Sequence, residues 1–160
     1  MSKYPYRQNR EEIKALLEQF DNLKAGKVNS FLEEDSFERI IDYFDEKEQL
    51  ADALEVAEYG IEQYPYSSLL LLKKADLLIA LKRYKEALVI LDHAETLDSK
   101  DANLYILKTD AYLALDLQLK AASVLEAAIE DFDGEEKVDL LFELADVYDD
   151  YENFDKVFDC

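Results

Sequence analysis

Apolar residues recur along most of the chain at the three- and four-residue spacing of amphipathic helices. Two such stripes, separated by a turn at Lys82-Arg83, consist of Leu70, Leu71, Leu77, Leu78 and Leu81 and of Tyr84, Ala87, Leu88, Leu91 and Ala94. Ser67 and Ser68 stand before the first stripe, where a hydroxyl can cap a helix. The pattern therefore predicts a pair of helices joined by a tight turn.

This pair of helices repeats along the chain with a 34-residue period. Small residues recur at that spacing in two sets, Ala53, Ala87 and Ala121, and Gly60, Ala94 and Ala128. Large residues do the same in two more sets, Phe37, Leu71 and Tyr105, and Phe44, Leu78 and Tyr112. Several columns of like residues at one period are typical of a repeat protein. Each repeat is therefore expected to be one helical hairpin.

The small residues on the second helix of each hairpin allow a close approach to neighbouring backbone. The large residues at positions 37, 71 and 105 are the expected partners that fill the space. Enlarging Ala87 should therefore overpack this contact and cost roughly 1–3 kcal/mol.

The pattern resembles the tetratricopeptide repeat (TPR) family, whose unit is a helix–turn–helix of about 34 residues. The residues that carry the resemblance are Leu71, Ala75, Leu78, Tyr84, Ala87 and Ala94, together with Pro65 after the preceding second helix. The resemblance implies an all-α fold, a right-handed superhelical solenoid of helix–turn–helix repeats. This sequence departs from the family at Lys74 and Lys108, where a leucine is usual, and at Ser99 and Asp133, where a proline often ends the helix.

Residues 1–30 are expected to form an N-terminal tail, an amphipathic capping helix and a linker. The repeats then follow as residues 34–67, residues 68–101, residues 102–137 with a longer loop, and an incomplete fourth repeat at 138–160. In the fourth repeat the pattern is displaced by two residues, to Leu141, Leu144, Ala145, Tyr148 and Phe154, with Val157 in place of the alanine. The sequence stops at Cys160, about two turns into the expected second helix. An uncovered apolar face is therefore expected at this end.

Composition limits the classes of partner. The chain has 38 acidic and 18 basic residues, a formal net charge of -20, with 49% hydrophobic residues. This charge repels phosphate backbones and anionic membrane surfaces, so neither nucleic acid nor membrane is an expected partner. Basic proteins would be attracted. The single cysteine, the absence of an apolar signal segment and the short apolar runs favour a soluble, cytoplasmic protein.

No catalytic motif is found. His93 is the only histidine, so neither a catalytic triad nor a histidine-rich metal site can be built. Gly26-Lys27 lacks the upstream glycine of a phosphate loop. The stretch DFDGEEKVDLLFE has its glycine fourth instead of sixth, so it does not match a calcium loop. We therefore expect no enzyme activity, no metal and no cofactor.

The resemblance implies a binding groove on the first helices, where the residue after the small alanine points inward. Aspartates occupy that place in all four repeats: Asp42, Asp76, Asp110 and Asp146. The other groove candidates include Leu72, Lys73, Ile79, Ile106, Leu113, Phe142 and its neighbour Glu143. Family members that grip a peptide's carboxylate carry asparagine and lysine around this groove, so that activity is not carried over to this chain.

Two interpretations of the aspartates stay open. They can line a groove for a basic or amphipathic peptide, or they can pair internally with Lys74 and Lys108. The predicted function is a non-enzymatic scaffold or adaptor that binds a protein or peptide. The alternatives are a helper or regulatory domain of a larger protein that continues past Cys160, and self-association through the open C-terminal end.

Overall fold

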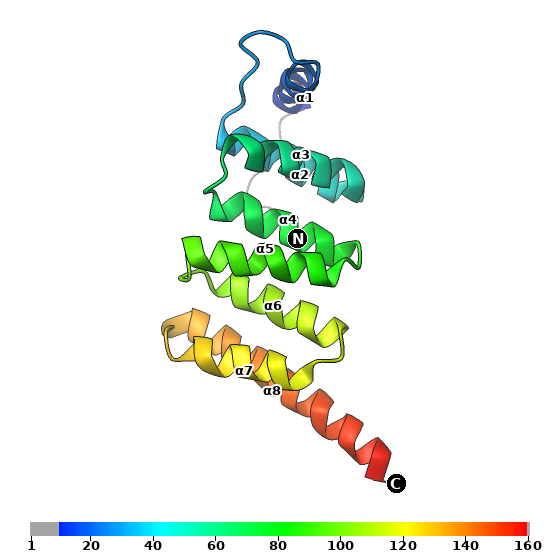
Figure 1. Cartoon of the computed structure of the whole chain (residues 1–160), viewed down its shortest axis with the longest axis vertical. Helices are drawn as coiled ribbons and strands as arrows, with labels where there is room; N and C mark the ends of the chain where they lie inside the picture. Colours follow the sequence, from blue (N-terminus) through cyan, green and yellow to red (C-terminus); the bar gives the residue numbers. More distant parts are fainter. Residues whose placement is uncertain (1–9, 160) are drawn as a thin grey trace. The chain divides into compact units, whose positions relative to one another are not determined.

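The computed structural model describes residues 10–159 of the chain, and the side chains of residues 10–149. This part consists of helices and contains no strand (Figure 1). The helices are α1 (Arg10–Lys24), α2 (Glu34–Glu46), α3 (Leu50–Gln63), α4 (Ser68–Ala80), α5 (Tyr84–Leu97), α6 (Ala102–Ala114), α7 (Gln118–Ile129) and α8 (Gly134–Asp159). The prediction of an all-α fold is confirmed.

The chain divides into two compact units, residues 1–77 and residues 78–160. The boundary lies within α4. Unit 1 contains α1, α2, α3 and most of α4, whereas unit 2 contains the end of α4 and helices α5 to α8.

The hairpin of α2 and α3 in unit 1 shows why a small residue is needed on the second helix. A Cβ atom added to Gly60 would lie 3.1 Å from both Phe37 Cγ and Leu70 Cδ1. Phe37 is fully buried, and Ala53 on the same helix as Gly60 is also fully buried. The large side chain therefore fills the space that the small one leaves, as the repeat pattern predicts.

Helix α1 packs on this hairpin through its apolar stripe. Its Ile13 and Phe20 are buried, and the Phe20 ring meets the Tyr59 ring edge-on at 5.5 Å between centroids. Lys24 Nζ donates to Glu55 Oε1 at 3.1 Å. In Figure 1 α1 is seen nearly end-on, while α2 and α3 run across the view. Within unit 1, α1 thus covers the hairpin without continuing its repeat pattern.

Three successive turns close in the same way. Glu48, Lys82 and Asp116 each adopt the left-handed conformation, with φ of 60°, 63° and 60°, and they are separated by the 34-residue period. The N–H of the following residue donates to the carbonyl oxygen five residues back, at 2.8–2.9 Å. Such bonds satisfy carbonyls at a helix end. The turn is therefore part of the repeat, although a non-glycine residue occupies its strained position.

Unit 2 buries the small residues that the sequence singled out. Ala87, Ala94 and Ala121 are fully buried, and so are Leu91, which lies between the first two, and Leu125, four residues after Ala121. Two further contacts fix the start of α6: the Tyr105 hydroxyl donates to the Ser99 carbonyl oxygen at 3.1 Å, and its ring meets that of Phe132 edge-on at 5.8 Å.

The last segment differs from the prediction. A turn and a second helix were expected within residues 138–160, but α8 is one continuous helix that begins at Gly134, inside the expected loop. Position 152, one 36-residue step after the turn residue Asp116, is helical. The side chains of Phe154 and Val157, and Cys160, lie outside the described residues.

Two fully or almost fully buried residues fix the orientation of α8. Leu140 and Val147 lie one 36-residue step after Leu104 and Ala111, which are also buried. This spacing agrees with a displacement of two residues relative to the 34-residue period. Helix α8 therefore occupies the place of a first helix, although no second helix follows it in the described chain.

Candidate functional site

The predicted groove residues fall into both units. In unit 1, Asp42 and Leu72 are buried, Lys73 is half-buried and Asp76 is exposed. In unit 2, Asp110, Phe142 and Asp146 are exposed, whereas Ile79, Ile106 and Leu113 are half-buried. The assignment of these residues to a groove stays a prediction, but the structure places some of them in direct contact or close interaction.

In unit 1 the contact is an ion pair between first helices. Lys73 Nζ on α4 donates to Asp42 Oδ1 on α2 at 2.6 Å. Only 3% of the Asp42 side chain is exposed. Burial raises the pKa of the nearby Glu38 carboxyl, while the Lys73 charge opposes that rise and the Asp42 charge adds to it. Lys73 therefore stands among carboxylates and neutralises a buried one, so this position acts as a structural contact.

The internal pairing predicted for Lys74 and Lys108 needs correction. Lys74 Nζ lies 4.0 Å from Glu58 on α3, and Lys108 Nζ lies 2.9 Å from Asp92 on α5 and also donates to Glu95. These lysines thus pair with second helices instead of with the groove aspartates. The pattern was present in the sequence, because Glu58 and Asp92 are separated by the 34-residue period, as the lysines are.

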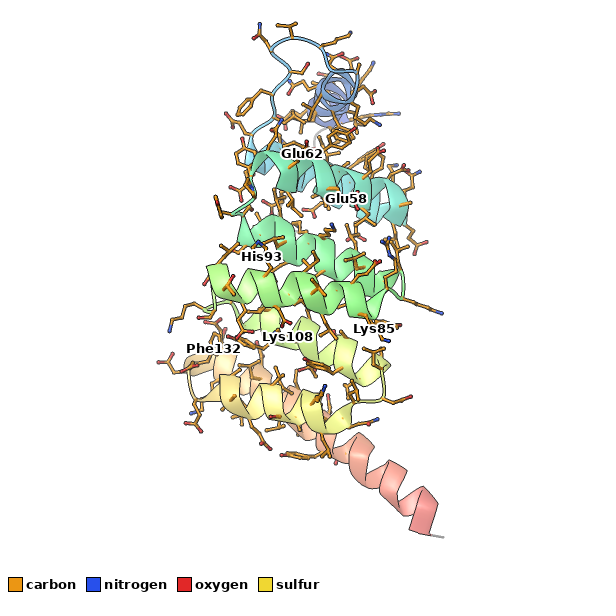
Figure 2. All side chains as sticks on the ribbon, in the orientation of Figure 1. Glu58, Glu62, Lys85, His93, Lys108 and Phe132 are labelled. Atoms are coloured by element: carbon orange, nitrogen blue, oxygen red, sulfur yellow. The ribbon has the colours of Figure 1, made fainter. Side chains whose placement is uncertain are left out.

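Lys108, labelled in Figure 2, is more enclosed than Lys74, because 9% of its side chain is exposed against 23% for Lys74. Burial lowers the pKa of Lys108, but its hydrogen bonds to Glu95 and Asp92 outweigh burial and raise the pKa above the usual 10.5. Lys108 therefore remains charged and links α6 to α5.

In unit 2, carboxylates occupy the positions equivalent to the ion pair of unit 1 and act on one another through their charge. Burial raises the pKa of Glu143 on α8, and the negative charges of Asp110, Asp146 and Asp139 raise it further. Glu143 follows Lys73 by one 34-residue and one 36-residue step. The repeat thus brings Glu143 toward Asp110 as it brings Lys73 toward Asp42, but with the opposite charge. We call Asp110, Asp139, Glu143 and Asp146 the acidic cluster.

The sequence already placed Glu143 among the groove candidates, beside Phe142, but did not predict the interaction with its carboxylate neighbours. The two-residue displacement of the last repeat aligns Glu143 with Lys73. Phe142, next to it in the sequence, exposes 69% of its surface. The acidic cluster and this ring can together stabilise a cationic side chain and contact an apolar one.

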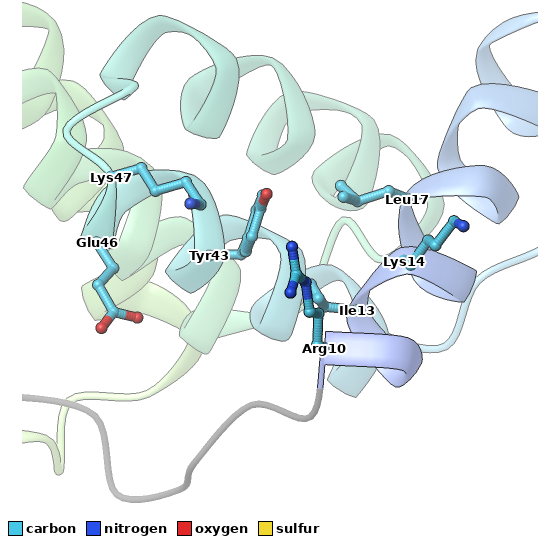
Figure 3. A pocket seen from close by; sticks show the side chains of 7 residues that line it. All are labelled: Arg10, Ile13, Lys14, Leu17, Tyr43, Glu46 and Lys47. Carbon is cyan, nitrogen blue, oxygen red and sulfur yellow. The ribbon is translucent and has the colours of Figure 1, made fainter.

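A separate pocket lies between α1 and α2 in unit 1 (Figure 3). Its volume is about 570 Å³, and its lining is Arg10, Ile13, Lys14, Leu17, Tyr43, Glu46 and Lys47. The Lys47 ammonium lies 5.1 Å from the centre of the Tyr43 ring, a cation–π contact. Cations outnumber carboxylates in this lining, so the pocket differs in charge from the acidic cluster.

The described part offers no metal-binding group and no membrane-spanning helix. Among residues 10–149, whose side chains the structure describes, no group of three or more histidine, cysteine or acidic side chains is arranged to hold a metal ion. His93 is exposed on α5 (Figure 2). None of the helices within this range combines the length and the apolar character needed to span a membrane.

No family model matches the sequence, and no curated protein matches it. Solved structures nevertheless share the fold. The first TPR of Spaghetti (RPAP3), bound to the HSP90 peptide SRMEEVD, has a TM-score of 0.65 at 18% identity, covering 74% of this chain and 93% of that one. The first TPR domain of human RPAP3 has a TM-score of 0.63 at 18% identity, covering 75% and 95%. The Arabidopsis OM64 TPR domain has a TM-score of 0.62 at 13% identity, covering 71% and 93%. This chain therefore has the tetratricopeptide repeat fold that the sequence predicted.

Proposed function

We propose that this chain is a protein-interaction module that binds a basic segment of a partner protein at the acidic cluster of unit 2. The observation that carries the proposal is the gathering of three aspartates around Glu143, which together with burial raises the pKa of that carboxyl. Carboxylates held together in this way repel one another. A lysine or arginine from a partner would relieve that repulsion and gain charge-assisted hydrogen bonds.

The charge of the cluster favours a ligand unlike the one bound by the neighbour of known structure. The HSP90 peptide SRMEEVD carries two glutamates and one aspartate against a single arginine. Such a peptide would meet carboxylates at the acidic cluster, and the net charge of -20 would oppose its approach. A basic peptide would instead be attracted both by the whole molecule and by the cluster, and Phe142 would contact its apolar residues.

The experiment measures binding of a short basic peptide in which lysine and leucine alternate with proline, so that the peptide cannot form a helix. The variant is Asp110→Asn with Asp146→Asn. The matched control is Glu126→Gln with Glu130→Gln, which removes two exposed negative charges from the second helix and its end in the same unit.

We expect the aspartate variant to bind roughly ten-fold more weakly, since two exposed charge pairs contribute about 1.4 kcal/mol together. The control should bind within about two-fold of the original chain, and added salt should weaken all three. Equal losses in variant and control would show that only net charge matters, and would reject the acidic cluster as the site.

A role as scaffold or adaptor without catalysis of its own fits the proposed binding function. The cytoplasmic location, and a role as helper domain within a longer protein, remain predictions from the sequence.

A further inference from the structure

Helix α1 forms one wall of the pocket in unit 1, in addition to covering the hairpin of α2 and α3. Its lining residues lie three or four positions apart, so they share one face of the helix: Arg10, Ile13, Lys14 and Leu17. Ile13 is buried and Leu17 is half-buried, whereas the two basic residues are exposed. This wall therefore combines an apolar base with a positively charged edge.

The opposite wall is the end of α2, where Tyr43, Glu46 and Lys47 are again three and four residues apart. The Lys47 ammonium lies 5.1 Å from the centre of the half-buried Tyr43 ring. In Figure 3 the side chains of Arg10 and Lys47 extend toward Tyr43, while the Glu46 carboxylate points away from them. Two cations from different helices therefore converge near one aromatic ring.

The basic residues of this pocket differ from their neighbour Arg39, whose guanidinium donates to Glu12 at 2.9 Å. Arg10, Lys14 and Lys47 form no ion pair with any side chain of residues 10–149. The chain carries 38 acidic and only 18 basic residues, so carboxylates are abundant. Three cations that nevertheless surround one pocket without such a partner indicate a site for a negative charge from outside.

The helical carboxylates near the pocket are directed to other sides. Successive residues of a helix are separated by about 100°. Glu11, Glu12 and Glu18 therefore lie roughly 90° or more around α1 from the centre of the lining face. Asp42 and Asp45 are displaced in the same way on α2, and Asp42 is already in its ion pair with α4. Neither helix thus turns its acidic residues onto the cations.

The lining defines the kind of ligand that fits. An acidic group would gain charge-assisted hydrogen bonds from Arg10 and Lys47. An aromatic or aliphatic body would contact the Tyr43 ring and the side chains of Ile13 and Leu17. The volume of about 570 Å³ is that of a small-molecule site. Because the net charge of -20 opposes the approach of anions, a ligand with a single negative charge fits better than a highly charged one.

We propose that this pocket binds a small organic anion that joins one acidic group to an aromatic or aliphatic body. Helix α1 then both covers the repeats and supplies half of a binding site. Residues 1–9 of the chain contain Lys3 and Arg7 but no acidic residue, so they offer these cations no carboxylate. The site is additional to the acidic cluster, which lies in the other unit and takes cations.

The test follows the NMR spectrum of the full chain during titration into the millimolar range with naphthoate, naphthylmethanol and naphthylmethylammonium. These probes share one ring system and differ in charge. The pocket variant is Arg10→Gln with Lys47→Gln. The matched control is Lys100→Gln with Lys120→Gln, which removes the same charge from exposed positions in unit 2.

We expect naphthoate to shift the signals of Ile13, Leu17 and Tyr43 and to bind at least about ten-fold more tightly than the other two probes. The pocket variant should bind naphthoate about ten-fold more weakly, whereas the control should stay within about two-fold of the original chain. Binding of the proline-containing basic peptide should be retained in the pocket variant, so this proposal and the proposed function can fail separately.

Several results would overturn the proposal. These are equal binding of naphthoate and naphthylmethanol, equal naphthoate binding by the pocket variant and its control, and the absence of shifts at the pocket lining. Higher naphthoate affinity in Tyr4→Ser with Tyr6→Ser would show instead that the N-terminal residues of this chain fill the pocket. A dimer that the pocket variant abolishes would show that a second copy fills it.

Discussion

The α2–α4 contact of unit 1 and the α6–α8 contact of unit 2 are equivalent in the repeat but opposite in charge. In the first, Lys73 donates to the buried Asp42 at 2.6 Å. In the second, Glu143 takes the place of the lysine, and burial together with the negative charge of Asp110 raises its pKa. The same backbone arrangement therefore supports a stabilising ion pair in one unit and an electrostatically strained surface in the other.

The comparison separates structural charges from charges that a partner can use. A buried carboxylate with a lysine beside it is already satisfied, and removing either partner leaves an uncompensated charge. Carboxylates that gather on a partly exposed surface gain from any cation that arrives. Recurring aspartates in a sequence pattern therefore do not by themselves mark a binding groove, because the residue opposite each aspartate decides its role.

The largest effect is expected when unit 1 is made to resemble unit 2. Lys73→Glu would place a carboxylate against Asp42 and near Glu38, both already acidic. We expect a loss of about 2–3 kcal/mol of unfolding free energy, somewhat less than for a fully buried pair because 22% of the Lys73 side chain is exposed. Urea unfolding followed by circular dichroism measures it.

The matched control is Lys85→Glu, which makes the same change of charge at an exposed position on α5 (Figure 2). Its effect should stay within about 0.5 kcal/mol. If Lys73→Glu and Lys85→Glu lower the unfolding free energy by the same amount, the Asp42–Lys73 pair makes no specific contribution to stability.

The reverse exchange should stabilise unit 2. Glu143→Lys would place a cation among Asp110, Asp139 and Asp146. Asp139 precedes this position by one helical turn, and an acidic residue four places before a lysine is the favourable order for a helical ion pair. We expect the unfolding free energy to rise by about 0.5–1 kcal/mol, measured by urea unfolding. The same variant should lose binding of the basic peptide, because it places a cation in the acidic cluster.

Glu126→Lys on the exposed side of α7 is the control for this exchange. It changes the net charge equally but should alter stability by less than about 0.5 kcal/mol. An equal gain in both variants would mean that general repulsion in an acidic protein, and not the cluster, is what the substitution relieves.

The periodic part of this fold could be read from the sequence. The four columns of small and large residues place Ala53, Ala87 and Ala121 in the core, where the structure finds them fully buried. Ser67 also caps α4 as expected, since its Oγ accepts from the Leu70 N–H at 3.1 Å. These features depend on local pattern and on packing between successive helices, and a 34-residue period encodes both.

Contacts that depend on the direction of a side chain could not be predicted from the repeat pattern of the sequence. The sequence offered Lys74 as the partner of groove aspartates, but the lysine that reaches Asp42 is its neighbour Lys73. Successive residues are about 100° apart on a helix, so a lysine and its neighbour face different helices. The continuous α8 was missed for another reason: an apolar stripe predicts a helix but does not show whether it ends in a turn.

The smallest expected effect is a pH dependence that belongs to Glu143. Its pKa in the folded chain is raised above the ordinary 4.5, so the protonated form is favoured by folding. The resulting stabilisation is complete below about pH 4.5 and is lost as the pH rises through the raised pKa. Glu143→Gln should therefore match the original chain in acid and become more stable than it toward neutral pH, by up to about 1 kcal/mol for two like-charge helix neighbours.

Unfolding curves at a series of pH values for Glu143→Gln and for Glu126→Gln measure the difference, and the second variant supplies the change that any lost carboxylate produces. A constant offset between Glu143→Gln and the original chain at all pH values would show that Glu143 is not strained by its neighbours, and the contrast with the Asp42–Lys73 pair would then reduce to the presence or absence of one ion pair.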